Sequence, residues 1–190
     1  MRPAARRRRR AGITLLELVV ALTVVGLMAG MAVSRLRVTP SQRVRAAGVQ
    51  LAQDLEATRT RALSTRRAAR VVFDVAGGRY RGYLANQGVS TFSQSAAEAA
   101  ALGTLRNRPL MEGVTFGRGT APKLAGDDGN GAVTLASSRV DFNSRGLTAP
   151  FGARGTIYLT HRDDPTSVVA VAVSGAGSFR VWVHRPGGWE

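Results

Sequence analysis

The sequence contains no cysteine among its 190 residues. A disulfide framework, a reactive thiolate and a thiolate-bound metal are therefore excluded. Only two histidines are present, His161 and His184, and they stand far apart in the chain. His161 has Asp163 and Asp164 nearby, but no nucleophile-elbow motif accompanies them. We therefore favour a histidine at a sheet edge beside a turn over a catalytic site.

The sequence also lacks a strong motif for a metal or a phosphate. Residues 127–131 (Asp-Asp-Gly-Asn-Gly) resemble part of an oxygen-ligand calcium loop. They lack the later bidentate Glu, so an Asx-type turn is favoured. Gly175 and Gly177 precede a predicted strand, whereas a phosphate-binding loop precedes a helix. We expect no catalytic residues, no metal and no cofactor, and hence a protein that is not an enzyme.

Acidic residues are scarce, with 12 Asp and Glu against 27 Lys and Arg, which gives a net charge of +15. Six of the arginines lie within the first ten residues. Positive residues beside a first apolar segment stay on the cytoplasmic side of a membrane. Removing these six leaves 21 basic against 12 acidic residues, or +9, for the rest of the chain.

One long apolar run follows the arginines, from Ile13 to Val33. At about 1.5 Å per residue it makes a helix about 31 Å long, which matches a hydrocarbon core of about 30 Å. A secretory signal peptide has a shorter apolar region of about 7–15 residues, and residues 29–31 (Ala-Gly-Met) make a poor cleavage site for it. A plain signal anchor fits the length but leaves one acidic residue, Glu17, without a purpose. At the centre of such a helix an acid costs about 2.5–3.5 kcal/mol, and less near its end.

Residues 12–17 (Gly-Ile-Thr-Leu-Leu-Glu) resemble the processing site of type IV pilins and type II secretion pseudopilins. The resemblance implies that prepilin peptidase cleaves between Gly12 and Ile13 and that Ile13 is then N-methylated, although Phe is commonest at that position. Cleavage there places a new amine one helical turn from Glu17. The resemblance further implies that Glu17 acts in subunit assembly, by pairing with a neighbour's amine.

This resemblance also implies a domain organisation and a location. Residues 1–12 are expected to form a leader that is removed on maturation, and residues 13–38 a transmembrane and assembly helix. Residues 39–190 are then a periplasmic globular domain. The protein is expected to cross the inner membrane once and to enter a pilus-like filament.

A second helix is predicted from about residue 42 to residue 67. Thr39 suits the N-cap, Pro40 the first helical position, and Gln42 completes the spacing of a capping box. We expect a kink or short break there, because proline removes one backbone hydrogen bond. Apolar or small residues recur at steps of three and four, which predicts a face packed on a sheet. These residues are Val44, Gly48, Leu51, Leu55, Thr58 and Ala62.

The remaining chain is β-rich. Hairpin turns are predicted at residues 76–78 and 174–177, a short helix at 96–102 and a loop at 121–131. Strands are predicted at 70–75, 79–84, 114–116, 132–135, 139–142, 156–161, 167–173 and 178–183. The expected fold is pilin-like α+β: a long N-terminal helix, membrane-spanning and then amphipathic, packed on antiparallel β-sheet.

The later chain resembles the H-type minor pseudopilins more narrowly. The resemblance lies in helix residues 51–62 before a Val-Val-Phe strand, in residues 140–146, and in the closing hairpin at 177–181. It implies a structural subunit of a type II secretion system or a type IV pilus-like filament. The implied partners are prepilin peptidase, other pilin or pseudopilin subunits and inner-membrane lipid.

The basic excess outside the leader has two interpretations. Arginines could contact a polyanion through its phosphates, with Trp182 and Trp189 stacking on single-stranded bases. This favours an alternative function as a DNA-binding minor pilin of a DNA-uptake pilus. Alternatively, the arginines cover solvated faces and some face anionic lipid. The candidate polyanion contacts are Arg59, Arg61, Arg66, Arg67, Arg180 and Arg185.

Overall fold

The structure is a computed structural model that describes residues 14–34, 39–92, 99–101, 105 and 107–190. The chain divides into two compact units, Met1–Val38 and Thr39–Glu190. In the first unit the described element is one helix, α1 (Leu15–Ser34). In the second, the long helix α2 (Pro40–Thr65) precedes a series of strands.

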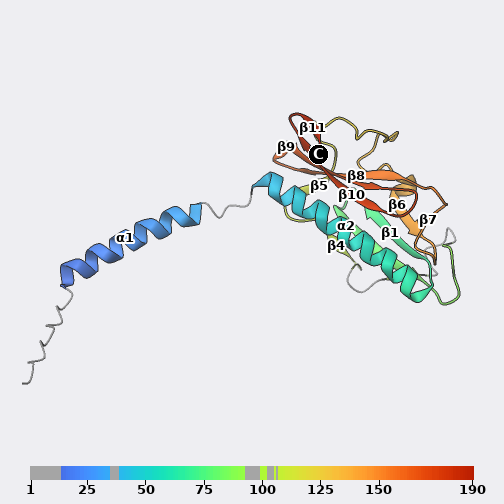
Figure 1. Cartoon of the computed structure of the whole chain (residues 1–190), viewed down its shortest axis with the longest axis horizontal. Coiled ribbons are helices and arrows are strands. Elements are labelled where there is room, and N and C mark those ends of the chain that lie inside the picture. Colours follow the sequence, from blue (N-terminus) through green and yellow to red (C-terminus); the bar gives the residue numbers. More distant parts are fainter. Residues whose placement is uncertain (1–13, 35–38, 93–98, 102–104, 106) are drawn as a thin grey trace, which may run out of the picture. The chain divides into compact units, whose positions relative to one another are not determined.

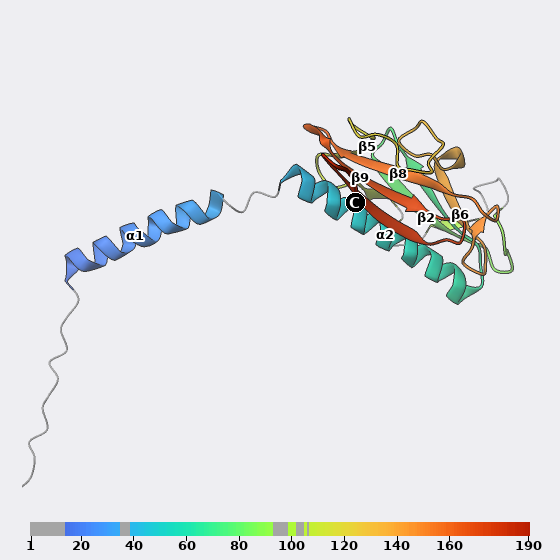
Figure 2. The same ribbon diagram turned by 45° about the horizontal axis from the view of Figure 1, so that its top comes forward.

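The strands of the second unit form two antiparallel sheets (Figures 1 and 2). The first has the order β3-β2-β1-β6-β7, with β4 also paired to β2, and the second has the order β11-β10-β9-β8-β5. The strand bounds are β1 Ala69–Asp74, β2 Arg79–Ala85, β3 Ala99–Ala101, β4 Arg108–Pro109, β5 Val114–Phe116, β6 Arg139–Phe142, β7 Thr148–Ala149, β8 Gly155–His161, β9 Asp164–Val173, β10 Phe179–Arg185 and β11 Gly188–Trp189.

A capping box begins α2, as the sequence predicts. The Gln42 amide N–H donates to Oγ1 of Thr39 at 3.4 Å, and the Thr39 amide N–H donates to Oε1 of Gln42 at 3.1 Å. Pro40 occupies the first turn, where its missing N–H costs nothing. The helix ends at Arg66, whose left-handed φ of 54° breaks the helical path. Local side chains thus satisfy two of the backbone amides, those of Thr39 and Gln42, that a helix start leaves without an intrahelical partner.

The buried face of α2 is the predicted stripe, and all six of its residues are buried, together with Ala47. Figures 1 and 2 show α2 running along the sheet that contains β8, β9 and β10. The approach is close, since a Cβ placed on Gly48 would lie 2.5 Å from Cγ1 of Val169 on β9. Leu51 and Leu55 are fully buried between α2 and the two sheets, in one apolar core.

Both predicted hairpins are present. In the first, β1 and β2 pair from Ala69 opposite Leu84 to Asp74 opposite Arg79. In the second, β9 and β10 pair around the turn at residues 174–178. The predicted strands at 114–116, 139–142 and 156–161 also correspond to β5, β6 and β8.

Two predictions of local structure are wrong. Residues 99–101 form strand β3 instead of part of a helix, because pairing with residues 83–85 of β2 overrides the helical preference of alanine. Residues 96–98 and 102 lie outside the described residues. Residues 132–135 do not form a strand; Val133 makes a single bridge to Ile157, beside the Thr134 hydrogen bonds to Thr156. The two-residue strands β4, β7 and β11 were not predicted, because such short pairings leave no periodic pattern.

Candidate assembly helix and outer-face pocket

Thr14 begins α1. Its side-chain Oγ1 accepts a hydrogen bond from the Glu17 amide at 3.2 Å, and its carbonyl accepts one from the Leu18 amide at 3.1 Å. Threonine is a favoured N-cap residue for this reason. Gly12 and Ile13, the predicted cleavage and methylation positions, lie outside the described residues.

Glu17 lies in the first turn of α1. The free amides at a helix start carry partial positive charge, which stabilises a carboxylate there. Among the described residues, no salt bridge involves Glu17, and its side chain is exposed.

The described side chains of α1 are almost all apolar, and they are exposed. Leu15 is 83% exposed and Met28 is 67% exposed. The one hydroxyl in the helix interior, on Thr23, donates to the carbonyl of Val20 at 2.8 Å and so needs no outside partner. Within the described residues, no helix meets the length and apolarity required to span a membrane.

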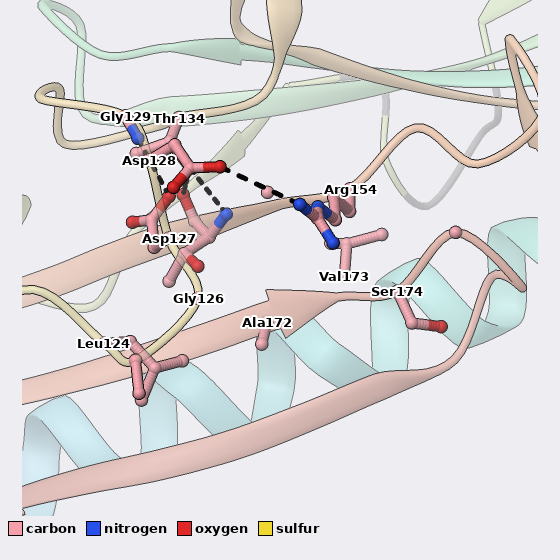
Figure 3. Close-up of a pocket in the computed structure, with 14 residues that line it drawn as sticks. Leu124, Gly126, Asp127, Asp128, Gly129, Thr134, Arg154, Ala172, Val173 and Ser174 are labelled. Carbon is pink, nitrogen blue, oxygen red and sulfur yellow. Dashed lines mark hydrogen bonds and ion pairs between the residues drawn. The ribbon is translucent and has the colours of Figure 1, made fainter.

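A pocket of about 390 Å³ lies on the second unit, on the face of the second sheet away from α2 (Figure 3). The loop Leu124–Gly129 lines one side, and Ala172 to Gly175 at the end of β9 line the other. Asp128 and Arg154 approach each other at the rim, with 3.8 Å between Oδ2 and Nη2. A second hollow of about 580 Å³ shares Leu124 and Ala172 and continues toward β10.

The loop that lines this pocket is held by one buried tyrosine. The Tyr158 hydroxyl donates to Oδ2 of Asp127 at 2.6 Å and accepts from the Leu124 amide at 2.9 Å. Burial and the hydrogen bond to the Asp127 carboxylate raise the pKa of Tyr158 to about 12. Trp189 packs on Tyr158, with ring centroids 6.0 Å apart, and its indole N–H donates to the Pro122 carbonyl at 3.2 Å. The sequence gives no signal for these links, because their members are distant along the chain.

The two patterns considered in the sequence for chemistry serve the fold. Asp127 accepts from the Gly129 amide at 3.3 Å, which is the favoured Asx turn. His161 is buried at the end of β8, beside a turn as expected, but β8 lies between β5 and β9 and is not at the sheet edge. Its Nδ1 accepts from the Asp163 amide at 3.2 Å. Hydrogen bonds from Ser167 and Thr166 lower the pKa of Asp164.

Three of the six candidate polyanion-binding arginines have structural partners. Arg59 donates to the Gly146 carbonyl at 2.8 Å and also pairs with Glu56. Arg67 donates to the Ala85 carbonyl at 2.6 Å, and Arg185 pairs with Glu190 at 2.9 Å. These contacts tie the end of α2 and the last strands to their surroundings.

The other three, Arg61, Arg66 and Arg180, are exposed and form no salt bridge with another described residue. Arg61 and Arg66 lie at the end of α2. Arg180 lies on the face of β10 that carries Trp182, whereas Phe179 and Val181 face the core. Arg180 therefore faces away from the side of the sheet on which α2 packs.

Comparison with known proteins bears on both units. The model of the prokaryotic N-terminal methylation motif matches residues 7–33. No curated protein matches the sequence. Among solved structures, the minor pseudopilin EpsH of the type 2 secretion system of Vibrio cholerae is similar, with a TM-score of 0.51 and 11% identity over 74% of this chain and 97% of that one. The type IV minor pilin FimU of Pseudomonas aeruginosa gives a TM-score of 0.46 and 16% identity, over 77% of this chain and 92% of that one.

The second unit thus has a pilin-like α+β fold, as the sequence predicts. The likeness to EpsH shows this shared fold, and the matched motif lies in the segment that precedes it. The chain therefore carries an N-terminal methylation motif ahead of a unit whose fold is similar to that of a minor pseudopilin.

Proposed function

We propose that this protein is a minor structural subunit of a type II secretion or type IV pilus-like filament. Prepilin peptidase would cut between Gly12 and Ile13, and Ile13 would be methylated. The unit Thr39–Glu190 would then lie on the periplasmic side of the inner membrane, held by the N-terminal helix. The observation that carries the proposal is α1: an apolar helix with exposed side chains and one carboxylate in its first turn.

Glu17 sets the register in which this helix joins a neighbouring subunit. A carboxylate near the membrane interface costs free energy unless it finds a cation. The cleaved chain of a neighbour supplies one, the amine of its Ile13. Pairing of the two charges favours transfer of the helix into the filament only in register with that neighbour, because close charges interact strongly in low-dielectric surroundings.

The role is proposed as structural and not enzymatic. The groups that the sequence offered for chemistry have structural uses: Asp127 holds Tyr158, and Asp164 accepts from Thr166 and Ser167. His161 accepts a hydrogen bond at the turn that follows its own strand. The apolar side chains of α1 are exposed and available to a partner.

Replacing the carboxylate tests this function. Glu17→Ala should leave membrane insertion and leader removal intact while blocking incorporation into filaments. Thr23→Val is the matched control on the same helix, because Thr23 bonds only to its own backbone. Mass spectrometry of the N-terminus, membrane fractionation and the subunit content of sheared filaments are the measurements. Normal incorporation of Glu17→Ala would show that the pairing mechanism is wrong.

Processing can be tested separately. Gly12→Trp should leave an uncut precursor that still carries the leader arginines, because a bulky residue does not fit a narrow extended substrate site. Mass spectrometry that finds a normal Ile13 terminus would contradict this expectation.

A further inference from the structure

Strand β10 has an open edge. One side pairs with β9 from Phe179 to Val183. The other side pairs with β11 only at His184 and Arg185, and the Val183 amide and carbonyl then bond to Glu190 at 2.8 and 3.0 Å. In the described chain, no strand pairs with this side of β10 before Val183.

The register identifies which backbone groups face this open side. The Ser174 amide donates to the Ser178 carbonyl across the hairpin, so even-numbered β10 residues carry the hydrogen bonds to β9. Val183 bonds on the opposite side, to Glu190, as an odd-numbered residue must. By the same alternation, the N–H and C=O groups of Phe179 and Val181 point to the open edge. An edge of this kind is a template for another strand.

A hollow accompanies this edge on each face of the sheet. On the α2 side, a hollow of about 250 Å³ is lined by Val49, Ala52, Gln53, Glu56, Phe179 and Val181. On the outer side lies the hollow of about 580 Å³ described above, with Arg180 and Trp182 in its wall. Alternate side chains of an added strand would enter these two hollows in turn, because successive residues point to opposite faces.

Both hollows have mainly apolar walls, and the outer one adds a guanidinium. Val49, Ala52 and Val181 make the α2 side largely apolar. On the outer side, the Arg180 guanidinium lies 5.6 Å from the Trp182 ring centroid and has no carboxylate partner among the described residues. A guanidinium fixed over an aromatic face still presents its N–H donors to a carboxylate. The complementary strand is therefore apolar on one face and acidic on the other.

We propose that the open edge of β10 binds an extended segment of another protein by strand addition. The segment alternates apolar residues, which face α2, with acidic residues, which face Arg180. Backbone hydrogen bonds to Phe179 and Val181 supply affinity, and the two hollows supply specificity, as in other strand-addition complexes. The residues of this surface all belong to the second unit, so the proposal does not rest on the role proposed for Glu17.

Binding of a defined peptide tests the proposal. The probe is a capped nine-residue peptide in which valine and aspartate alternate, titrated against the full chain in detergent micelles. We expect saturable binding, and slower hydrogen exchange at the Phe179 and Val181 amides in the complex. Absence of binding, or binding without protection of these amides, would overturn the proposal.

A single substitution can test the open edge of β10 without disturbing its pairing with β9. Val181→Pro removes an outward N–H without breaking a bond to β9, and proline is tolerated at such edge positions. Peptide affinity should fall at least about tenfold, whereas Val181→Thr, which keeps the N–H and changes only the wall of the α2-side hollow, should lose clearly less affinity. A peptide N-methylated at alternate residues gives the same test without changing the protein. Unchanged affinity in both tests would mean that the peptide does not pair with β10.

The preference for an acidic segment is tested by reversing the charge at residue 180 and in the peptide. Arg180→Glu should lower the affinity for the valine–aspartate peptide by about tenfold and raise the affinity for a valine–lysine peptide. Arg154→Glu, on the far rim of the outer-face pocket, is the matched control and should change neither affinity by as much. If the wild-type chain binds both peptides equally, the acidic face assigned to the partner is wrong.

Discussion

At the residue scale, one buried guanidinium of the second unit is paired with a carboxylate. The Arg70 guanidinium donates to both carboxylate oxygens of Asp141 at 2.6 and 2.7 Å, between β1 and β6. The ring of Phe92 lies 4.5 Å from the same guanidinium. Arg70 is 4% exposed, so its charge depends on Asp141 for compensation.

Asp141→Ala should therefore destabilise the second unit by about 3–5 kcal/mol, because it leaves a buried cation unpaired. Asp128→Ala, which breaks the exposed pair with Arg154, should cause no measurable loss. Urea unfolding of the unit Thr39–Glu190 provides the free energies. Equal stabilities for the two variants would show that the Arg70 pair is not a structural requirement.

The raised pKa of Tyr158 predicts a dependence on alkaline pH. Because the folded-state pKa is about 12 and the ordinary value is 10, the stability due to this hydroxyl is full below pH 10 and is lost as pH rises toward 12. Tyr158→Phe should cost about 1–3 kcal/mol at pH 7, since it leaves partners unsatisfied. The difference between variant and wild type should then narrow from pH 10 to pH 12, as followed by unfolding at each pH. A constant difference would contradict the role given to this proton.

At the element scale, α2 is fixed by its fit to β9. Gly48 stands where a Cβ would meet Val169 at 2.5 Å, so the helix approaches the sheet more closely there than alanine allows. The predicted stripe included this glycine on periodicity alone. Periodicity could not predict that Gly48 marks a close approach to β9, because that strand lies more than a hundred residues later in the sequence.

Gly48→Ala should destabilise the unit by about 1–3 kcal/mol through overpacking, even though alanine favours helix by about 1 kcal/mol. Adding Val169→Ala should recover part of the loss, because it removes the methyl groups that clash. Thermal unfolding of both single variants and the double variant gives the coupling free energy. Additive losses would place the effect of Gly48 elsewhere than at Val169.

Sequence patterns predicted the helices and strands in which buried residues recur at a regular spacing. The stripe on α2 and the strands from residue 156 onward are of this kind. Sequence patterns failed where pairing is brief or local, as at Val133 and at residues 99–101, because tertiary contacts there outweigh propensity. For the candidate sites, the role of Glu17 stays a prediction from its motif. The pocket held by Tyr158 was not predicted, because spatial neighbours such as Asp127 and Trp189 have no fixed spacing.

At the scale of the whole molecule, three of the six candidate polyanion-binding arginines already have partners within the second unit. Arg59, Arg67 and Arg185 form hydrogen bonds or ion pairs within the second unit. Arg180 lies on the face of β10 that points away from the core. A dispersed positive charge attracts polyanions only weakly once salt screens it.

We therefore expect duplex DNA to bind the chain weakly at about 50 mM salt, without sequence preference, and to dissociate by about 200 mM salt. Gel-shift titrations at both salt concentrations are the measurement, with Arg61→Ala and Arg66→Ala variants for comparison. Tight binding that survives the higher salt and depends on these arginines would instead support the DNA-uptake alternative.

The capping box at Thr39 has a consequence for the order of biogenesis. Because Thr39 and Gln42 start α2 locally, this helix does not need α1 as a preceding helical turn in order to form. Under the proposed function, the periplasmic unit can complete its folding while the N-terminal helix is still in lipid. Maturation and withdrawal from the bilayer would then move a finished domain, and only the surroundings of α1 would change.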